Sequence, residues 1–498
     1  MSSITVRQGK NTASIDFQPG ETLLSALRNA GYSIPAACGG KGRCGKCRVS
    51  VNGVPRLACK TVSQDNDEVI LNENAGGVIL SSLAALPKAQ KGRSGLAAAV
   101  DLGTTTVVLR LFELSAGRLI SEKRDWNCQS AYGADVISRI QYTIENNNGL
   151  SELSNRIRSQ INALLKEALD ETNQSIGDVR EIVIAGNTVM QHIFDNRPVE
   201  SIARAPFKPQ TLFENSAGTP LEGIPVRFAG CVAGYVGGDI TSGILADGIA
   251  DMTGERLFLD IGTNGEMVLG SKSGFLCCAV ASGPAFEGAG ISCGMPGIAG
   301  AVSHVRYDKG FLFDVIGASE PKGICGSGLV DLAAILLDSG VIDPGGRLLP
   351  PEDVPENMRR YVTRDENGNG VFQLTNNVYL NALDVRNLQL AKAAVAGGIR
   401  VLLEQRGISA SDLQSVELAG GFGSYIAPQS AVRIGMLPKE CLGKIRAMGN
   451  TSLAGASMLA LDEAFWDKLC KISDMCHYIE LSGRPDFSAA FTDNLVFS

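Results

Sequence analysis

The sequence lacks several features that would assign it to common protein classes. Only 3 of its 498 residues are histidine, so hydrolytic chemistry that uses a histidine base is poorly supported. No uninterrupted apolar run approaches the ~18 residues that a membrane-spanning helix needs. The first residues, MSSITVRQGKNTASIDF, contain no apolar segment of the kind found in signal peptides. We therefore expect a cytoplasmic protein that does not span a membrane.

An excess of basic residues is also missing. The chain has 45 Lys and Arg against 52 Asp and Glu, which gives a formal net charge of −7. Proteins that bind nucleic acids or anionic membrane surfaces usually present a basic face. The charge balance therefore argues against nucleic acid or a membrane as the partner.

The length and composition indicate a soluble protein of several domains. A chain of 498 residues is too long for one hydrophobic core, and 44% hydrophobic with 19% charged residues is ordinary for globular proteins. Many of the 58 glycines stand in short turns beside Asp and Thr, which is typical of phosphate-binding loops. The predicted division is a first domain at 1–73, a linker at 74–95, and two further units at 96–250 and 251–498.

Four of the 13 cysteines form a motif near the N-terminus. Cys38, Cys44, Cys47 and Cys59 have the spacing Cys-x5-Cys-x2-Cys-x11-Cys, and the glycines between them allow tight turns. Four thiolates complete the ligand set of one [2Fe–2S] cluster. A zinc site is the alternative, but zinc usually takes paired Cys-x2–4-Cys units and only one such pair is present. The spacing resembles the adrenodoxin-like variant of the ferredoxin fold.

The pattern around this motif predicts a small β-rich domain with a helix, and the resemblance implies an α+β, ferredoxin-like β-grasp fold for it. Asn52-Gly53 is a strong hairpin signal between two short apolar runs. Basic residues crowd the cysteine loop, and they either dock an acidic electron donor or form a solvated rim. The expected strands cover 4–6, 13–17, 48–51, 54–58 and 69–71, the expected helix covers 22–30, and the basic residues are Lys41, Arg43, Lys46 and Arg48.

The rest of the chain contains an internal repeat. AVDLGTTTVVLRL, with Asp101, and FLDIGTNGEMVLG, with Asp260, are both an apolar strand, an Asp-x-Gly-Thr turn and a second strand, about 160 residues apart. Two such hairpins predict a duplicated α/β domain with a cleft between its halves. Helices are expected at 133–145, 152–173, 328–339, 385–405 and 449–469.

The turns of this repeat suit a nucleotide. Backbone amides and hydroxyls of an Asp-x-Gly-Thr turn can cradle phosphates, while the Asp faces Mg²⁺ through water. A third element, VELAGGFGSY at 416–425, is a strand that ends in a Gly-Gly turn, which lets an adenosine approach closely. Phosphate, phosphate and adenosine segments in this order resemble the actin-like superfamily of heat-shock chaperones and sugar kinases (ASKHA), which has a duplicated ribonuclease H-like fold.

The chain is more specifically similar to the ATP-dependent reductive activators of corrinoid proteins, which join a [2Fe–2S] ferredoxin domain to an actin-like ATPase. This resemblance implies [2Fe–2S], ATP and Mg²⁺ as cofactors. It implies an ATP-hydrolysing oxidoreductase that passes one electron from a low-potential donor (ferredoxin, flavodoxin or reductase) to a corrinoid protein, reducing Co(II) to Co(I) in a methyltransferase system. A homodimer is the family-level expectation. The matching segments are 127–140, 185–194, 234–240, 260–266, 282–291, 323–333, 384–395 and 418–426.

The resemblance also implies roles for individual residues. Asp101 and Asp260 are the expected Mg²⁺-facing carboxylates. Asn187, Asp239 and Glu287 either position water or metal, or cap helices. The expected nucleotide-binding residues are Gly103, Thr104, Thr105, Thr106, Gly262, Thr263 and Asn264 at the phosphates, Gly326 and Ser327 at a helix start that suits an anion or a cap, and Gly420, Gly421 and Phe422 at the adenine or ribose.

The chain departs from the family pattern in two places, and two alternative functions remain open. Longer members of the family have an extra domain where this chain has its linker, and Cys128 stands where the family pattern has Pro. Activators of 2-hydroxyacyl-CoA dehydratases also couple an actin-like ATPase to a cluster, but they have no separate ferredoxin domain. A redox-sensing protein that binds nucleotide without turnover is the non-enzymatic alternative.

Overall fold

The computed structural model describes most of the chain. Cys38, Cys44 and Thr263 lie outside the described residues, and so does most of the predicted linker. Within the described ranges, no helix is long and apolar enough to cross a membrane. The described residues are 2–8, 11–30, 32, 47–71, 90–133, 135–262, 264–288, 290–317 and 319–497.

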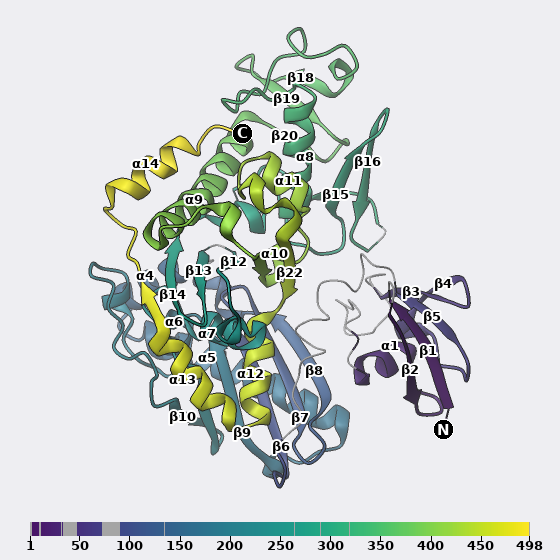
Figure 1. Cartoon of the computed structure of the whole chain (residues 1–498), viewed down its shortest axis with the longest axis vertical. Helices are drawn as coiled ribbons and strands as arrows, with labels where there is room; N and C mark the ends of the chain where they lie inside the picture. The colour runs from purple at the N-terminus through teal and green to yellow at the C-terminus, as the bar shows by residue number, and fades with distance from the viewer. Residues whose placement is uncertain are drawn as a thin grey trace.

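In the described part of the N-terminal domain, a five-stranded sheet packs against the helix α1, as predicted (Figure 1). The strand order is β2-β1-β5-β3-β4, with β1 and β5 parallel and the other pairs antiparallel. Asn52 and Gly53 both have positive φ, 50° and 81°, which is the hairpin geometry that an Asn-Gly pair favours. The elements are β1 (Ser2–Gln8), β2 (Asn11–Phe17), α1 (Leu23–Asn29), β3 (Arg48–Val51), β4 (Val54–Leu57) and β5 (Glu68–Leu71).

A six-stranded sheet follows, in the order β10-β11-β9-β6-β7-β8. Its strand β6 pairs antiparallel with β7 and parallel with β9. The elements are β6 (Leu96–Leu102), β7 (Thr106–Glu113), β8 (Arg118–Trp126), α4 (Val136–Glu145), α5 (Gly149–Thr172), β9 (Val179–Gly186), α6 (Thr188–Phe194), β10 (Ala217–Leu221), β11 (Ile224–Phe228) and α7 (Gly238–Asp247).

A second six-stranded sheet repeats this arrangement, in the order β22-β21-β12-β13-β14-β23. Here β12 pairs antiparallel with β13 and parallel with β21, just as β6 pairs with β7 and β9. The predicted duplication of the α/β fold is therefore confirmed. The elements of this sheet are β12 (Arg256–Ile261), β13 (Gly265–Ser271), β14 (Gly274–Val280), β21 (Ser415–Ala419), β22 (Ile445–Gly449) and β23 (Cys476–Tyr478).

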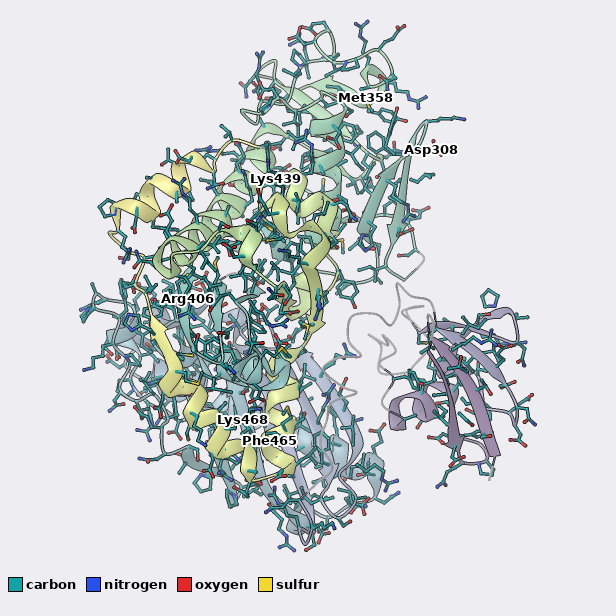
Figure 2. All side chains as sticks on the ribbon, in the orientation of Figure 1. Asp308, Met358, Arg406, Lys439, Phe465 and Lys468 are labelled. Carbon is teal, nitrogen blue, oxygen red and sulfur yellow. The ribbon has the colours of Figure 1, made fainter. Side chains whose placement is uncertain are left out.

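The remaining elements follow β14 in the sequence, and most of them share a hydrophobic core with the second sheet, whereas α12 also contacts the first. Arg406, labelled in Figure 2, ends α9 and donates through Nε and Nη2 to the two carboxylate oxygens of Glu255, at 3.0 and 2.7 Å, which fixes that helix to the start of β12. The elements are β15 (Ala301–Tyr307), β16 (Phe311–Val315), β17 (Gly323–Ile324), α8 (Gly326–Asp338), β18 (Val362–Arg364), β19 (Gly370–Gln373), β20 (Tyr379–Leu380), α9 (Ala382–Arg406), α10 (Gly420–Gly423), α11 (Pro428–Arg433), α12 (Thr451–Leu461), α13 (Ala464–Met475) and α14 (Pro485–Asp493).

One helix prediction was wrong. The sequence pattern predicts one helix over 449–469, but the structure has two, α12 and α13, separated by Asp462 in an extended conformation (φ −147°, ψ 125°). The Asp462 carboxylate accepts a hydrogen bond from the amide of Ala464 at 2.9 Å and so helps to start α13. The predicted domain limits stay a prediction; in the structure β5 ends at Leu71 and β6 begins at Leu96.

Helices α7 and α12 pack against each other between the two sheets (Figure 1). All of α12 is buried, and most of α7 is. Their backbones approach so closely that a Cβ at Gly455 of α12 would lie 2.1 Å from the carbonyl oxygen of Ser242 in α7. This pair of helices therefore joins the two halves of the duplicated domain, and the N-terminal ends of both helices lie at the carboxylates described next.

Candidate functional site: a carboxylate-lined cleft and a cysteine pair

Asp101 and Asp260 occupy equivalent places in the two halves. Each is the last but one residue of its strand, β6 and β12, and the two carboxylates are close enough for the charge of Asp101 to raise the pKa of Asp260. Burial is the larger cause of that shift, which brings the pKa of Asp260 to about 7. The two predicted Mg²⁺-facing residues are thus brought together from opposite halves.

The carboxylate of Asp101 is held at both oxygens by the start of α12. Asn450 donates through Nδ2 to Oδ2 at 2.7 Å, and Ser452 donates through Oγ to Oδ1 at 2.7 Å. Burial raises the pKa of Asp101, while these two hydrogen bonds oppose the rise. Asn450 and Ser452 were not predicted from the sequence, because they lie about 350 positions away from Asp101.

Two more acidic side chains join this pair. Asp239, in the first turn of α7, has its pKa raised to about 8 by burial and by the charges of Asp260 and Asp101. Glu266, at the second position of β13, has a strongly raised pKa, caused by burial and then by Asp239 and Asp260. Glu266 was not predicted from the sequence, although its position in the hairpin contains a signal. Glu266 lies directly opposite Asp260 in the antiparallel hairpin, so both side chains point to the same face.

A buried group of acids that raise each other's pKa favours the binding of a cation. The donors are all carboxylate oxygens, which is the chemistry that Mg²⁺ prefers. Within the described ranges, no three of these side chains are arranged to hold a metal ion by themselves. The arrangement therefore fits Mg²⁺ that keeps several waters and is bound together with a nucleotide's phosphates.

The first predicted phosphate loop, Gly103–Thr106, is held by hydrogen bonds to side chains from other parts of the fold. Asn187 donates through Nδ2 to Thr104 Oγ1 at 3.0 Å, and Thr105 donates through Oγ1 to Glu287 Oε2 at 3.1 Å. Asn187 also caps α6, where its Oδ1 accepts from the amide of Met190, so the capping role predicted as one alternative is present. Thr106 is exposed and begins β7.

A buried arginine supports the same loop and was not predicted. Arg139 is completely buried and donates through Nη2 to the Thr104 carbonyl at 2.6 Å and through Nε to the Gly133 carbonyl at 3.1 Å. Burial lowers its pKa to about 10, so the side chain stays charged at neutral pH. Asn127 adds a bond from Nδ2 to the Gly103 carbonyl at 2.9 Å, and the next residue, Cys128, donates its amide to Gln160 Oε1 at 3.0 Å.

The second loop and the Gly-Gly turn adjoin Asp260. The Gly262 amide donates to the Asn264 carbonyl at 2.9 Å, which closes the loop. Gly420 has φ +77°, and a Cβ there would lie 2.3 Å from Asp260 Oδ1, so only glycine fits this position. Gly421 is exposed, with open space at its Cα, as expected for a backbone that borders a ligand.

The rings of Phe422 and Phe286 stack beside this turn, with centroids 4.6 Å apart and an interplanar angle of 20°. Gly326, the first residue of α8, fits beneath them, since a Cβ there would lie 2.0 Å from the Phe286 carbonyl oxygen. Ser327 is buried and donates through Oγ to the Ser303 carbonyl at 2.8 Å. The structure thus places Gly326 and Phe422 beside Phe286, and Glu287 beside Thr105 and Gly262, whereas the Ser327 hydroxyl is hydrogen-bonded within the fold.

The two described cysteines of the predicted cluster set lie together. Cys47 and Cys59 are buried, and their Sγ atoms are 3.2 Å apart, so one iron could accept both thiolates. The other two predicted ligands, Cys38 and Cys44, lie outside the described residues. The paired thiols fit half of a four-cysteine [2Fe–2S] ligand set.

Three family models match the chain in succession. Residues 6–71 match the 2Fe–2S iron-sulfur cluster binding domain, 96–252 match the RACo middle region, and 255–498 match the C-terminal domain of RACo, described as the ASKHA domain. The chain therefore has a [2Fe–2S] domain and an ATP-binding ASKHA domain.

Individual relatives are named as proteins that activate or reduce corrinoid proteins. The corrinoid activation enzyme RamQ of Eubacterium limosum is 33% identical over 433 residues, which cover 83% of this chain and 72% of RamQ. The [Co(II) methylated amine-specific corrinoid protein] reductase of Methanosarcina barkeri is 24% identical, over 59% of this chain and 58% of the reductase. A solved structure, titled reductive activator for corrinoid, iron-sulfur protein, is 28% identical, with a TM-score of 0.72 and coverage of 99% of this chain and 98% of that one. The chain belongs to the RACo family.

Proposed function

We propose that the protein is an ATP-dependent reductive activator of a corrinoid protein. One observation supports this most strongly: a single chain joins a cysteine pair suited to a [2Fe–2S] cluster to a buried group of carboxylates, Asp101, Asp239 and Asp260, at the predicted nucleotide cleft. The same order of domains is matched by the RACo family models, and the named relatives act on corrinoid proteins.

The proposed reaction moves one electron. The reduced cluster loses an electron, and Co(II) in the partner gains it and becomes Co(I), while an external donor restores the cluster. Each ~59 mV by which the donor falls short of the cobalt couple costs a factor of ten in the equilibrium constant for one electron. Coupling to ATP can overcome such a shortfall only if the nucleotide states bind the partner with different affinity.

The residues of the cleft have defined tasks in this scheme. The oxygens of Asp101, Asp239 and Asp260 attract the hydrated Mg²⁺ that accompanies the triphosphate. The loop that Arg139 and Asn187 hold in place presents its amides and hydroxyls to the phosphates. Bound Mg²⁺ neutralises the phosphate charge that develops during hydrolysis.

Three finer statements are part of the proposal. The electron donor is a low-potential ferredoxin, flavodoxin or reductase, and the active form is a homodimer, which analytical ultracentrifugation of the holoprotein would test. The location is the cytoplasm, and in support of this none of the eleven cysteines that the structure describes forms a disulfide.

The test is reduction of cobalt in a purified system. The holoprotein is mixed with a Co(II) corrinoid protein, a low-potential reductant and Mg²⁺, and Co(I) is followed by its absorbance. We expect Co(I) to form with ATP and not with ADP or without nucleotide. If the absorbance stays that of Co(II) with each of several corrinoid partners, the proposal is wrong, and the rate of ATP hydrolysis then distinguishes another ATP-driven activator from a protein that only binds nucleotide.

A further inference from the structure

Helix α12 contacts the cleft at one end and the linker at the other. At its N-terminal end, Asn450 and Ser452 hold the two carboxylate oxygens of Asp101. The eleven residues of the helix span about 16 Å at 1.5 Å per residue. At its C-terminal end lie residues 90–95, the last described part of the chain before β6.

The linker provides the partners that this helix end needs. The last carbonyls of a helix have no partner within the helix itself. Here the Gln90 amide donates to the Leu461 carbonyl at 3.1 Å, and Arg93 donates through Nη1 to the Ala460 carbonyl at 2.8 Å. The α12 sequence contains no Lys or Arg, so Arg93 provides the positive charge that favours a helix C-terminus.

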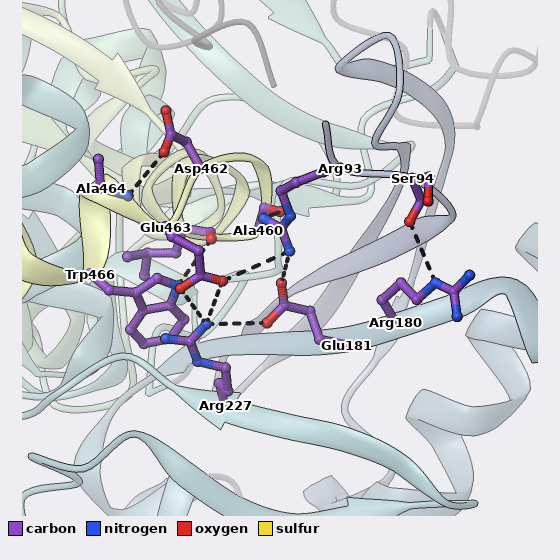
Figure 3. Close-up of polar contacts among 11 residues, drawn as sticks. Arg93, Ser94, Arg180, Glu181, Arg227, Ala460, Asp462, Glu463, Ala464 and Trp466 are labelled. Atoms are coloured by element: carbon purple, nitrogen blue, oxygen red, sulfur yellow. Dashed lines mark hydrogen bonds and ion pairs between the residues drawn. The ribbon is translucent and has the colours of Figure 1, made fainter. Parts of the chain in front are cut away.

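A network of charges fixes Arg93 in this position (Figure 3). Arg93 donates to Glu181 of β9 through Nη2, and Glu181 also lies 3.4 Å from Arg227 of β11. Arg227 in turn bonds both carboxylate oxygens of Glu463 at 2.9 Å and stacks 3.7 Å from the Trp466 ring at the start of α13. Most of these side chains are shielded from water, which makes the geometry specific.

The helix between the two ends is buried and closely packed along its whole length. Every residue from Thr451 to Leu461 is buried, and the close approach of Gly455 to Ser242 interlocks α12 with α7. Asp239, a further carboxylate of the cleft, is in the first turn of α7. Because closely packed interiors transmit displacements, a shift of Asp101 at one end of α12 moves the carbonyls at the other.

We propose that α12 couples the nucleotide cleft to the linker of the iron–sulfur domain, with Asn450 and Ser452 as positioning residues at the cleft and Arg93 as the anchor of the linker. Nucleotide and Mg²⁺ change the position of Asp101, α12 follows, and the anchor point of the linker moves with it. The inference rests on the proposed function only in that the cleft binds nucleotide and the linker leads to the cluster.

The test compares two arginines of the same region. Arg93→Met removes the side-chain contact of the linker with α12 and leaves only the Gln90 backbone bond to Leu461 among the contacts described above. Glu181 keeps Arg227 as a partner, so no buried carboxylate is left unpaired. Arg180→Met is the matched control, because Arg180 is exposed and lies against Ser94 and Gly95, with Nε 3.4 Å from the Ser94 carbonyl, and no hydrogen bond of the described residues joins it to α12. Hydrogen exchange of the segment 90–95 is measured in the full-length holoprotein, with and without Mg²⁺ and a non-hydrolysable ATP analogue.

In the native protein and in Arg180→Met we expect the analogue to change exchange of this segment several-fold. In Arg93→Met the response should disappear, with analogue affinity within about twofold of native. In Ser452→Ala, which keeps every linker contact, the response should be weakened. The inference is overturned if the analogue does not change hydrogen exchange of the segment 90–95 in the native protein, or if it changes exchange in Arg93→Met as much as in the native protein.

Two further measurements keep the interpretation unambiguous. If Arg93→Met lowers the thermal unfolding midpoint, Arg93→Lys is used in its place. The lysine keeps the positive charge beside Glu181 but cannot contact Glu181 and the Ala460 carbonyl with two separate nitrogens. A fully native exchange response of Arg93→Lys counts against the inference. If the exchange response is present but no partner is reduced, the proposed function fails and the coupling stands. If Co(I) forms but hydrogen exchange of the segment 90–95 does not change with the analogue, the proposed function stands and the coupling through α12 fails.

Discussion

Gly420 lies so close to Asp260 that a side chain at Gly420 would collide with the carboxylate: a Cβ would stand 2.3 Å from Oδ1. We expect Gly420→Ala to displace Asp260 and to lower the rate of ATP hydrolysis by at least tenfold, with added strain because φ is +77°. Steady-state hydrolysis of Mg·ATP measures this. Gly443→Ala, at an exposed glycine with open space around its Cα, is the control that should hydrolyse ATP at the native rate.

Glu266 adds an ionisable carboxyl opposite Asp260, and the effect of removing it has a predictable sign. Glu266→Gln keeps the shape of the side chain but removes one carboxylate that a bound cation would hold in the ionised form. We expect the Mg²⁺ concentration for half-maximal ATP hydrolysis to rise about tenfold, which corresponds to about 1.4 kcal/mol. A Mg²⁺ titration at fixed ATP is the measurement. An unchanged requirement for Mg²⁺ would mean that Glu266 has no part in attracting the ion.

Cys59 should be needed for the cluster and not for the fold of the nucleotide domain. We expect Cys59→Ser to lose the visible absorbance and the electron paramagnetic resonance signal of a [2Fe–2S] cluster, since one of the four ligands is replaced. ATP binding should persist, because the cleft residues lie in the other domain. Cys470→Ser, at an exposed cysteine of α13, should keep the full cluster content. A variant at Cys59 with native iron content would remove it from the ligand set.

Asp247, at the end of α7, predicts a pH dependence of stability. Burial and then the charge of Glu417 raise its pKa to about 7. In the unfolded chain this carboxyl ionises near its ordinary pKa of 3.8, so between about pH 4 and pH 7 the folded state holds the extra proton. The contribution of Asp247 to stability therefore falls as pH rises through that window and is constant above it.

Asp247→Asn should remove this loss of stability at higher pH. We expect the thermal unfolding midpoint of the variant to exceed that of the native protein by a few degrees at pH 8, and to match it near pH 4. Differential scanning fluorimetry across this range is the measurement. Asp353→Asn, at an exposed residue, serves as the control. If Asp247→Asn shows the native pH profile, Asp247 is ionised in the folded protein at low pH.

The features that could be predicted from the sequence are those that depend on residues close together in the chain. The two Asp-x-Gly-Thr hairpins, the Asn52-Gly53 turn and the strands of the first domain depend on neighbouring residues, and the structure confirms them. The duplicated fold followed from the two hairpins because the same local pattern occurs twice.

The parts that could not be predicted depend on contacts between distant segments. Asn450 reaches Asp101 across about 350 positions, and the N-cap of α12 gives no sign of that second task. In the sequence, Arg139 looks like an ordinary helix residue, and only the fold shows that it is buried and bonded to the Thr104 carbonyl. The break between α12 and α13 was missed because Asp462 lies in an apolar helical pattern that continues on both sides of it.

The anchoring of Gln90 and Arg93 on α12 also sets the length of the tether to the iron–sulfur domain. Only 18 residues, 72–89, separate β5 from the anchored segment, and a chain of that length can extend at most about 65 Å. The cluster is thus confined to a small volume around the nucleotide domain, which corresponds to an effective local concentration in the millimolar range. Dilution of the protein cannot separate the two, so contact between them should be independent of how much protein the cell contains.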